Sequence, residues 1–192
     1  LRSVLGGIIV TVLYVIIGLI VLAVVLAKLY LAAAGIEDIR VDTSAPVVVE
    51  SQDEDSIVLS KQLNFYNEGK QCATIMDAIC RSQLPYEQYD GIEVRGKAER
   101  EGEPREDDYF EAVLIQKKGD RNGEDKLNLF AKVRLTPRKG ADLKTALAHM
   151  VDLPLDFIWM ETGRTPWHYR KIRLVFTAEE IAKLADVQLV QD

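Results

Sequence analysis

The chain has 192 residues, with 30 acidic and 24 basic side chains and a net charge of −6. Residues 1–35 contain only two charged side chains, Arg2 and Lys28, so residues 36–192 hold 30 acids against 22 bases, a net charge of −8. This acidity argues against binding of nucleic acid, which needs concentrated Lys and Arg. It also argues against an outer domain that lies on an anionic membrane surface.

A long apolar stretch opens the chain. Residues 4–27 contain no charge, and residues 29–34 prolong the stretch. At about 1.5 Å per residue, such a helix is long enough to cross a hydrocarbon core of roughly 30 Å. Gly35 is predicted to end it, because glycine adopts the left-handed capping conformation at little cost. The stretch is apolar on every side, so we expect lipid or other helices to cover it. Its length and its poor cleavage region argue against a signal peptide.

A β-rich region follows. The sequence predicts an apolar helix over residues 1–35, a polar link over residues 36–46 and an extracytoplasmic domain over residues 47–192. β-Branched or alternating runs between turn signals predict strands at residues 47–50, 56–66, 72–80, 91–97, 109–117, 126–135, 153–160 and 168–176. Helices are predicted over residues 141–150 and from Thr177 to about Ala185, because Thr177 and Glu180 have capping-box spacing.

The turns suggest how these strands pair. Asn122-Gly123 predicts that residues 109–117 and 126–135 form a hairpin, and a second hairpin is predicted around Gly163. Residues 99–108 contain eight charged side chains and are predicted to be a solvated loop. Several short strands separated by turns indicate a mainly-β domain. We expect an antiparallel β-sandwich of the immunoglobulin-like kind, with one or two short helices.

Cys72 and Cys80 are the only cysteines. On one straight strand their sulfurs would lie about 26 Å apart, too far to bond. A disulfide, which an exported domain permits, would therefore need a turn near Met76 and Asp77. The alternative is two buried thiols that pack as small apolar side chains.

No catalytic or metal-binding pattern is visible. His149 and His168 lie in different predicted elements without metal-ligand spacing, and no nucleophile elbow, phosphate-binding loop or paired-cysteine motif occurs. Residues 120–125 resemble the start of a calcium loop, but the twelfth position is Ala131 instead of Glu, so a hairpin turn is predicted. We therefore expect no cofactor, no metal and no enzymatic activity.

Aromatic side chains gather in the last predicted hairpin, at Trp159, Trp167, Tyr169 and Phe176. Such residues usually form sandwich core and cross-strand pairs, and this is the prediction. A binding patch is the alternative.

Glycines in the apolar helix suggest contact with other helices. Gly7 and Gly18 are eleven residues apart, close to three turns, so they share a face on which helix backbones can approach closely. The candidate helix-packing residues are Gly6, Gly7, Ile8, Val12, Gly18, Leu19 and Leu22.

This order of parts resembles archaeal type IV pilins and archaellins. In those proteins the mature chain opens almost directly into an apolar helix and a β-sandwich follows; here Leu1-Arg2-Ser3 leads straight into the apolar stretch. The resemblance covers residues 1–35 and is a pattern, not a motif. It implies a filament in which the helices form a central bundle and the sandwiches lie outside. Leu5 stands where bacterial type IV pilins have Glu, which makes that branch a poorer match.

Two functions are therefore predicted. In the first, the chain is the structural subunit of a cell-surface filament, a homopolymer assembled through the helix, which lies in the membrane before assembly. In the second, it is a single-pass anchored accessory subunit of a larger membrane complex, and Lys28 extends to the outer face of the bilayer. An anchored enzyme or solute-binding domain is a more distant alternative.

Overall fold

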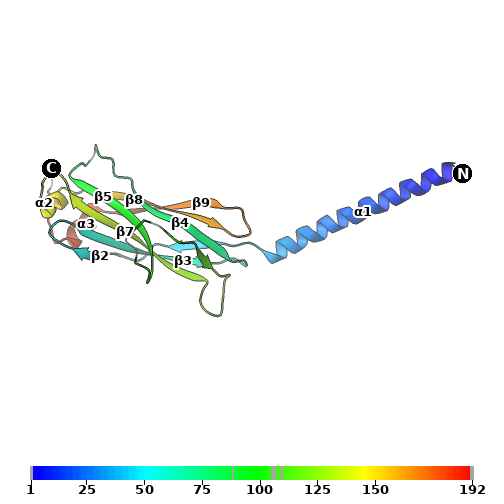
Figure 1. Cartoon of the computed structure of the whole chain (residues 1–192), viewed down its shortest axis with the longest axis horizontal. Coiled ribbons are helices and arrows are strands. Elements are labelled where there is room, and N and C mark those ends of the chain that lie inside the picture. The colour runs from blue at the N-terminus through cyan, green and yellow to red at the C-terminus, as the bar shows by residue number, and fades with distance from the viewer. Residues whose placement is uncertain (1, 88, 105–106, 109, 191–192) are drawn as a thin grey trace. The chain divides into compact units, whose positions relative to one another are not determined.

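The computed structural model describes every residue except 1, 88, 105–106, 109 and 191–192, and it describes residues 2–11 in backbone only. The chain divides into two compact units, Leu1–Ile36 and Glu37–Asp192. The first contains the helix α1 (Arg2–Ala34), which has 33 residues (Figure 1). Gly35 ends this helix with a φ of 69°, and its N–H donates to the Leu31 carbonyl at 3.2 Å. The predicted helix and its glycine terminator are confirmed.

The second unit is built mainly of strands (Figure 1). These are β1 (Ile39–Asp42), β2 (Val47–Gln52), β3 (Ile57–Asn67), β4 (Ala73–Ser82), β5 (Ile92–Arg100), β6 (Val113–Ile115), β7 (Lys126–Pro137), β8 (Leu153–Thr162) and β9 (His168–Phe176). One sheet has the order β1-β3-β7-β5, with β2 also paired to β3, and the other has the order β6-β4-β8-β9. Neighbouring strands are antiparallel in both sheets. The predicted antiparallel β-sandwich is confirmed.

Alternating side chains build the core between the sheets. Leu63 and Phe65 of β3 and Phe157 and Trp159 of β8 are at most 1% exposed. The rings of Phe65 and Trp159 meet edge to face with centroids 5.1 Å apart, and Phe157 lies 6.1 Å from Phe65. Burial of each large side chain contributes about 1.5–3 kcal/mol, so this aromatic cluster is a main link between the two sheets.

Two short helices lie beside the strands, α2 (Leu143–Ala148) and α3 (Ala178–Leu184). The Thr177 side chain accepts a hydrogen bond from the N–H of Glu180 at 3.2 Å, which confirms the predicted start of α3. Helix α2 is shorter than the predicted span of residues 141–150, because Asp142 caps its start and the helix ends before His149.

The predicted link over residues 36–46 contains a strand. Ile39 is fully buried and Val41 packs against the core, so β1 adds to the edge of the first sheet by pairing with β3. The sandwich therefore begins at Glu37, earlier than the predicted residue 47. A four-residue strand among polar residues is too short for a clear periodic signal.

The predicted hairpin between residues 109–117 and 126–135 is wrong. Strand β6 pairs with β4, whereas β7 pairs with β3 and β5, so the connection passes from one sheet to the other. A local turn does form: the Asp120 carboxylate accepts from the N–H of Asn122 at 2.9 Å, and Gly123 has a φ of 73°. A turn signal predicts a reversal of the chain but not which strand the chain meets next. The other predicted hairpin, β8 with β9, is confirmed.

The charged segment of residues 99–108 is only partly a solvated loop. Strand β5 continues through Glu99 and Arg100, and Glu99 is buried. Its carboxylate binds Lys132 of β7 at 2.7 Å and lies 3.6 Å from Lys97. Burial of this acid is tolerated because two cations accompany it, and the sequence segment alone does not show these partners.

A chain that begins at Glu37 should fold as a soluble monomer, because this unit has its own core and a domain of its size buries well over half of its unfolded surface. Circular dichroism should show a cooperative β-sheet transition, and sedimentation should give a monomer mass. The full-length chain, which should need detergent, is the control. Aggregation of the truncated chain, or a spectrum without β structure, would contradict the boundary at Ile36.

Candidate functional site

Helix α1 is the most distinctive feature of the chain. Its segment Val12–Ala34 is long and apolar enough to cross a membrane, and it is the one such helix among the described residues. Within its own unit its side chains have almost no cover: Val12 is 51% exposed, Leu19 61% and Leu22 54%. Exposed apolar surface costs about 25 cal/mol per Å² in water, so this helix needs lipid or protein around it.

The predicted glycine face is geometrically available. Because α1 is continuous, residues eleven apart differ by only about 20° around its axis, so Gly7 and Gly18 lie on one face. A side chain added at Gly18 would meet no atom within 4 Å, so this position is open to a partner helix. Of the predicted packing residues, Gly6, Gly7 and Ile8 lie in the part of α1 whose side chains are not described.

Glu37 connects the start of the sandwich to the distant β8–β9 hairpin. Its buried carboxylate accepts hydrogen bonds from the backbone N–H groups of Arg164 at 3.0 Å and Thr165 at 2.9 Å. Gly163 permits this contact, because a Cβ there would lie 2.5 Å from the carboxyl carbon of Glu37 and 2.9 Å from the carbonyl oxygen of Cys72. We call this arrangement the Glu37 clamp.

The charge of Glu37 is favoured by these donors. Burial by itself would raise the pKa of the carboxyl group, but hydrogen bonds from the Thr165 side chain and from the backbone of Thr165 and Arg164 outweigh it. The pKa of Glu37 therefore lies below its ordinary value, and ionised Glu37 stabilises the fold.

Replacing Glu37 with Gln should lower the free energy of unfolding by about 1–3 kcal/mol at neutral pH, because charged hydrogen-bond acceptors are lost. Since the native pKa is lowered, this advantage of the wild type is complete above the ordinary glutamate pKa. It is lost as pH falls through the native value. Urea unfolding across this pH range measures both chains, with Glu124→Gln at an exposed position as the control. Equal stabilities at neutral pH would contradict the clamp.

A second polar cluster lies at the same end of β8 and β9. Buried Glu161 accepts from the indole Nε1 of Trp159 at 3.1 Å and from Arg170 at 3.3 Å, and His168 lies 3.4 Å away. Arg170 also donates to the carbonyl of Ile39 in β1 at 2.8 Å and lies over the Trp159 ring. The cluster joins the two sheets through satisfied polar groups.

The two histidines lie in different elements, as predicted. His149 follows α2 and His168 begins β9. Among the described residues, no group of three or more His, Cys, Asp or Glu side chains is placed to hold a metal ion.

The predicted aromatic cluster divides in two. Trp159 and Phe176 are fully buried, as expected for sandwich core. Trp167 is 66% exposed and Tyr169 61% exposed, and their rings meet edge to face with centroids 6.3 Å apart. The core prediction is wrong for this pair, because Trp167 lies in the hairpin turn and Tyr169 faces outward from β9.

The Cys72–Cys80 disulfide does not form in this structure, where both thiols are free. The chain between them continues as strand β4, with a bulge between Met76 and Ile79 instead of the tight turn that a bond requires. Cys72 is exposed, so the alternative of two buried thiols is also only half right. Burial raises the pKa of the Cys80 thiol to about 12.

The two thiols should therefore differ in reactivity. A maleimide or iodoacetamide at neutral pH should label Cys72 quickly, and it should label Cys80 only after unfolding, because a buried thiol with a raised pKa yields little thiolate. Intact mass and peptide mapping measure the two rates, with Cys72→Ser as the control. A native protein that resists alkylation until it is reduced would contradict this arrangement.

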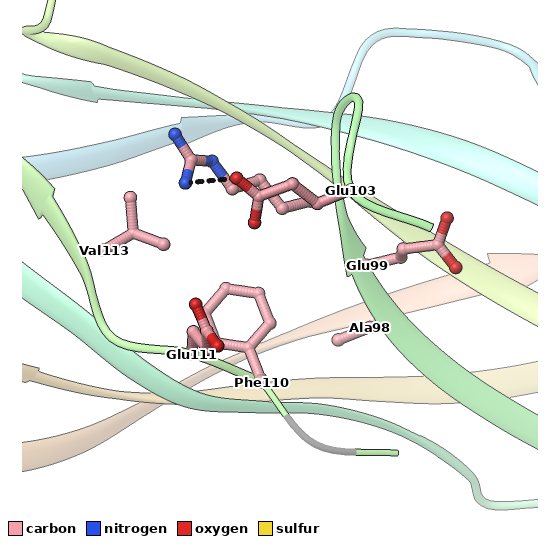
Figure 2. A pocket seen from close by; sticks show the side chains of 7 residues that line it. Ala98, Glu99, Glu103, Phe110, Glu111 and Val113 are labelled. Carbon is pink, nitrogen blue, oxygen red and sulfur yellow. Dashed lines mark hydrogen bonds and ion pairs between the residues drawn. The ribbon is translucent and has the colours of Figure 1, made fainter. Parts of the chain in front are cut away.

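The cavities lined by described residues differ widely in size. The cavity drawn in Figure 2 has about 10 Å³ of free space, which is about the minimum needed to hold one water molecule. Figure 2 shows Glu103 on one side of it and Phe110 on another, and the Glu103 carboxylate pairs with Arg100 at 2.9 Å. Larger hollows of about 500 and 570 Å³ lie at the surface, the second beside His149.

The polar contacts of the Glu37 clamp and of the Glu161 cluster were not predicted from the sequence. Glu37 and Thr165 are 128 positions apart, and no local pattern marks either of them. The one sequence feature that sets Glu37 apart is that it is the first acidic residue after the apolar helix.

Comparisons with known proteins do not place the chain in a family. No protein-family model and no curated protein matches it. Among solved structures, it is similar to the GAE domain of yeast GGA1, with 6% identity, a TM-score of 0.29, and coverage of 68% of this chain and 97% of that one. It is also similar to the GAE domain of GGA2p from Saccharomyces cerevisiae, with 5% identity, a TM-score of 0.28, and coverage of 69% and 98%. At TM-scores this low, the likeness gives no ground for a shared fold or function.

Proposed function

We propose that the chain is the structural subunit of a cell-surface filament, a homopolymer held together by α1. The observation that carries the proposal is the uncovered apolar surface of this helix. In the membrane, lipid tails cover it. On assembly, packing against other copies of α1 replaces these lipid contacts, and the close contact supplies dispersion energy.

The length of α1 supports a role beyond simple anchoring. About 20 residues suffice to span a bilayer, whereas α1 has 33 and is about 50 Å long. The glycine face through Gly7 and Gly18 adds a surface on which helix backbones can approach closely. A helix that only contacted lipid would gain nothing from these glycines.

The sandwich supplies the outer wall in this proposal, and its surface is the part available for adhesion. Its net charge keeps the exterior hydrated, and its two antiparallel sheets are compatible with an immunoglobulin-like arrangement, which we include in the proposal. We assign no catalytic role to it, since His149 and His168 lie in different elements and only His149 lines one of the hollows described above.

A single-pass anchored subunit of a larger membrane complex is the second candidate. Lys28 favours it, because this charge lies six residues before the end of α1 and would be costly inside a bundle. In a bilayer its ammonium group can reach the headgroup region. In a filament it must lie where the bundle meets the outer domains.

Replacing both Gly7 and Gly18 with Leu separates the two candidates. Overpacking costs typically about 1–3 kcal/mol at each site, and repetition along a polymer should abolish filaments. In an anchor that faces lipid, the same change should have almost no effect. Electron microscopy of surface preparations and membrane fractionation measure the outcome.

Ala23→Leu with Ala27→Leu is the matched control, since these small residues lie on the opposite face of α1 from Gly18. Filament loss with the glycine pair and normal filaments with the alanine pair are expected. Normal filaments from the glycine pair, or a wild-type chain that never leaves the membrane fraction, would reject the proposal.

A further inference from the structure

The outer face of the second sheet is apolar at the end that holds Glu37. Met76 of β4, Met160 of β8 and Tyr169 of β9 lie side by side in the sheet register, and Leu114 of β6 lies in the neighbouring row. Leu114 is 53% exposed, and Trp167 lies in the adjoining turn with its ring against Tyr169. We call these five residues the tip surface.

Polarity changes along this outer face. Moving away from the β8–β9 turn, the next row contains Ile79, Ile158 and Lys171, and the row after that contains Arg81, Asp156 and Arg173. The apolar side chains are therefore concentrated at the end where the Glu37 clamp lies, and the charged side chains are farther from it.

The hairpin is also basic within an acidic domain. Residues 153–176 contain four bases, Arg164, Arg170, Lys171 and Arg173, against two acids, Asp156 and Glu161. This net charge of +2 contrasts with −8 for residues 36–192 as a whole. The acidity of the domain argues against its lying flat on an anionic bilayer. The positive charge of the hairpin is divided between the rows of Lys171 and Arg173 and the turn end, where Glu37 offsets it.

The covalent link between the two units limits how far the Glu37 clamp can lie from the end of α1, whatever the orientation of the units. Helix α1 ends at Ala34, and the clamp holds Glu37 only three residues later. Three extended residues span at most about 10 Å, so the β8–β9 turn lies close to the point where the chain leaves the helix. Tryptophan and tyrosine concentrate at membrane interfaces, where an apolar ring and a polar edge are both accommodated.

We propose that the tip surface binds the interface of the bilayer in which α1 is inserted, with Trp167 and Tyr169 among the lipid headgroups. This inference requires only that α1 lies in a bilayer, which holds for the unassembled subunit of the proposed filament and equally for an anchored subunit.

Fluorescence of Trp167 in the full-length chain tests this proposal. The chain is inserted in vesicles of phosphatidylcholine and phosphatidylglycerol, with or without bromine on the acyl carbons nearest the headgroup. The difference between wild type and Trp167→Phe isolates Trp167, because the remaining Trp159 is fully buried in the sandwich. Brominated lipid should remove most of the Trp167 emission and leave that of Trp159 unchanged.

Val175 provides the matched control position. It is 50% exposed on the same outer face of β9, six residues from Tyr169 and away from the hairpin turn. In the double variant Trp167→Phe with Val175→Trp, the new tryptophan should keep its emission in brominated vesicles. Equal quenching at the two positions would overturn the proposal, because the whole sheet would then lie against lipid.

Two other results would also overturn it. Trp167 emission that is insensitive to bromine and remains accessible to acrylamide would show that the tip surface is in water. The Trp167 emission could instead be insensitive to bromine and protected from acrylamide. If dilution of the protein in the membrane removes this protection, a second copy covers the tip surface. None of these results bears on filament formation, which the Gly7 and Gly18 variants decide separately.

Discussion

The need to cover α1 governs the behaviour of the whole chain. The described part of α1, from Val12 to Ala34, has apolar side chains exposed all around it and is not stable in water by itself, so it needs lipid or other protein around it. The sandwich has no such need, because its own strands bury its core. The two units therefore divide the physical tasks: one determines where the chain resides, and the other presents a folded polar surface.

The sandwich combines an apolar centre with buried charges at its margins. Glu37, Glu99, Asp156 and Glu161 are all less than 10% exposed, and each has a cation or backbone N–H groups as partners. Among the described residues, no buried side-chain nitrogen or oxygen lacks a hydrogen-bond partner. Removing one partner of such a pair would be strongly destabilising, because it would leave a buried charge alone.

Local features of the fold could be predicted from the sequence. Hydrophobic periodicity predicts the apolar helix and most strands. Capping and turn chemistry predict the helix end at Gly35, the Thr177 cap and the β8–β9 hairpin. Long-range features could not be predicted in this way. The sheet to which β6 belongs, the burial of Glu99 and the outward position of Tyr169 all depend on strands far away in the chain.

The candidate site shows the same division. The composition of residues 1–35 predicts the helix and its glycine face, since both are local properties. The Glu37 clamp joins positions 127 and 128 residues apart, and nothing near Glu37 marks it as a clamp residue.

The clamp also determines how the sandwich would resist tension. Any force applied through α1 reaches the second unit at Glu37, just before β1. Strand β1 is a four-residue edge strand, and its antiparallel pairing with β3 alone would not prevent it from separating from β3. Glu37 diverts part of that force to the β8–β9 turn, and Arg170 holds the carbonyl of Ile39 two residues farther on. Strand β8 is paired on both sides, with β4 and β9, so the pull is shared with the interior of the opposite sheet. This short edge strand is thus braced at the place where a tethered or polymerised subunit would be pulled.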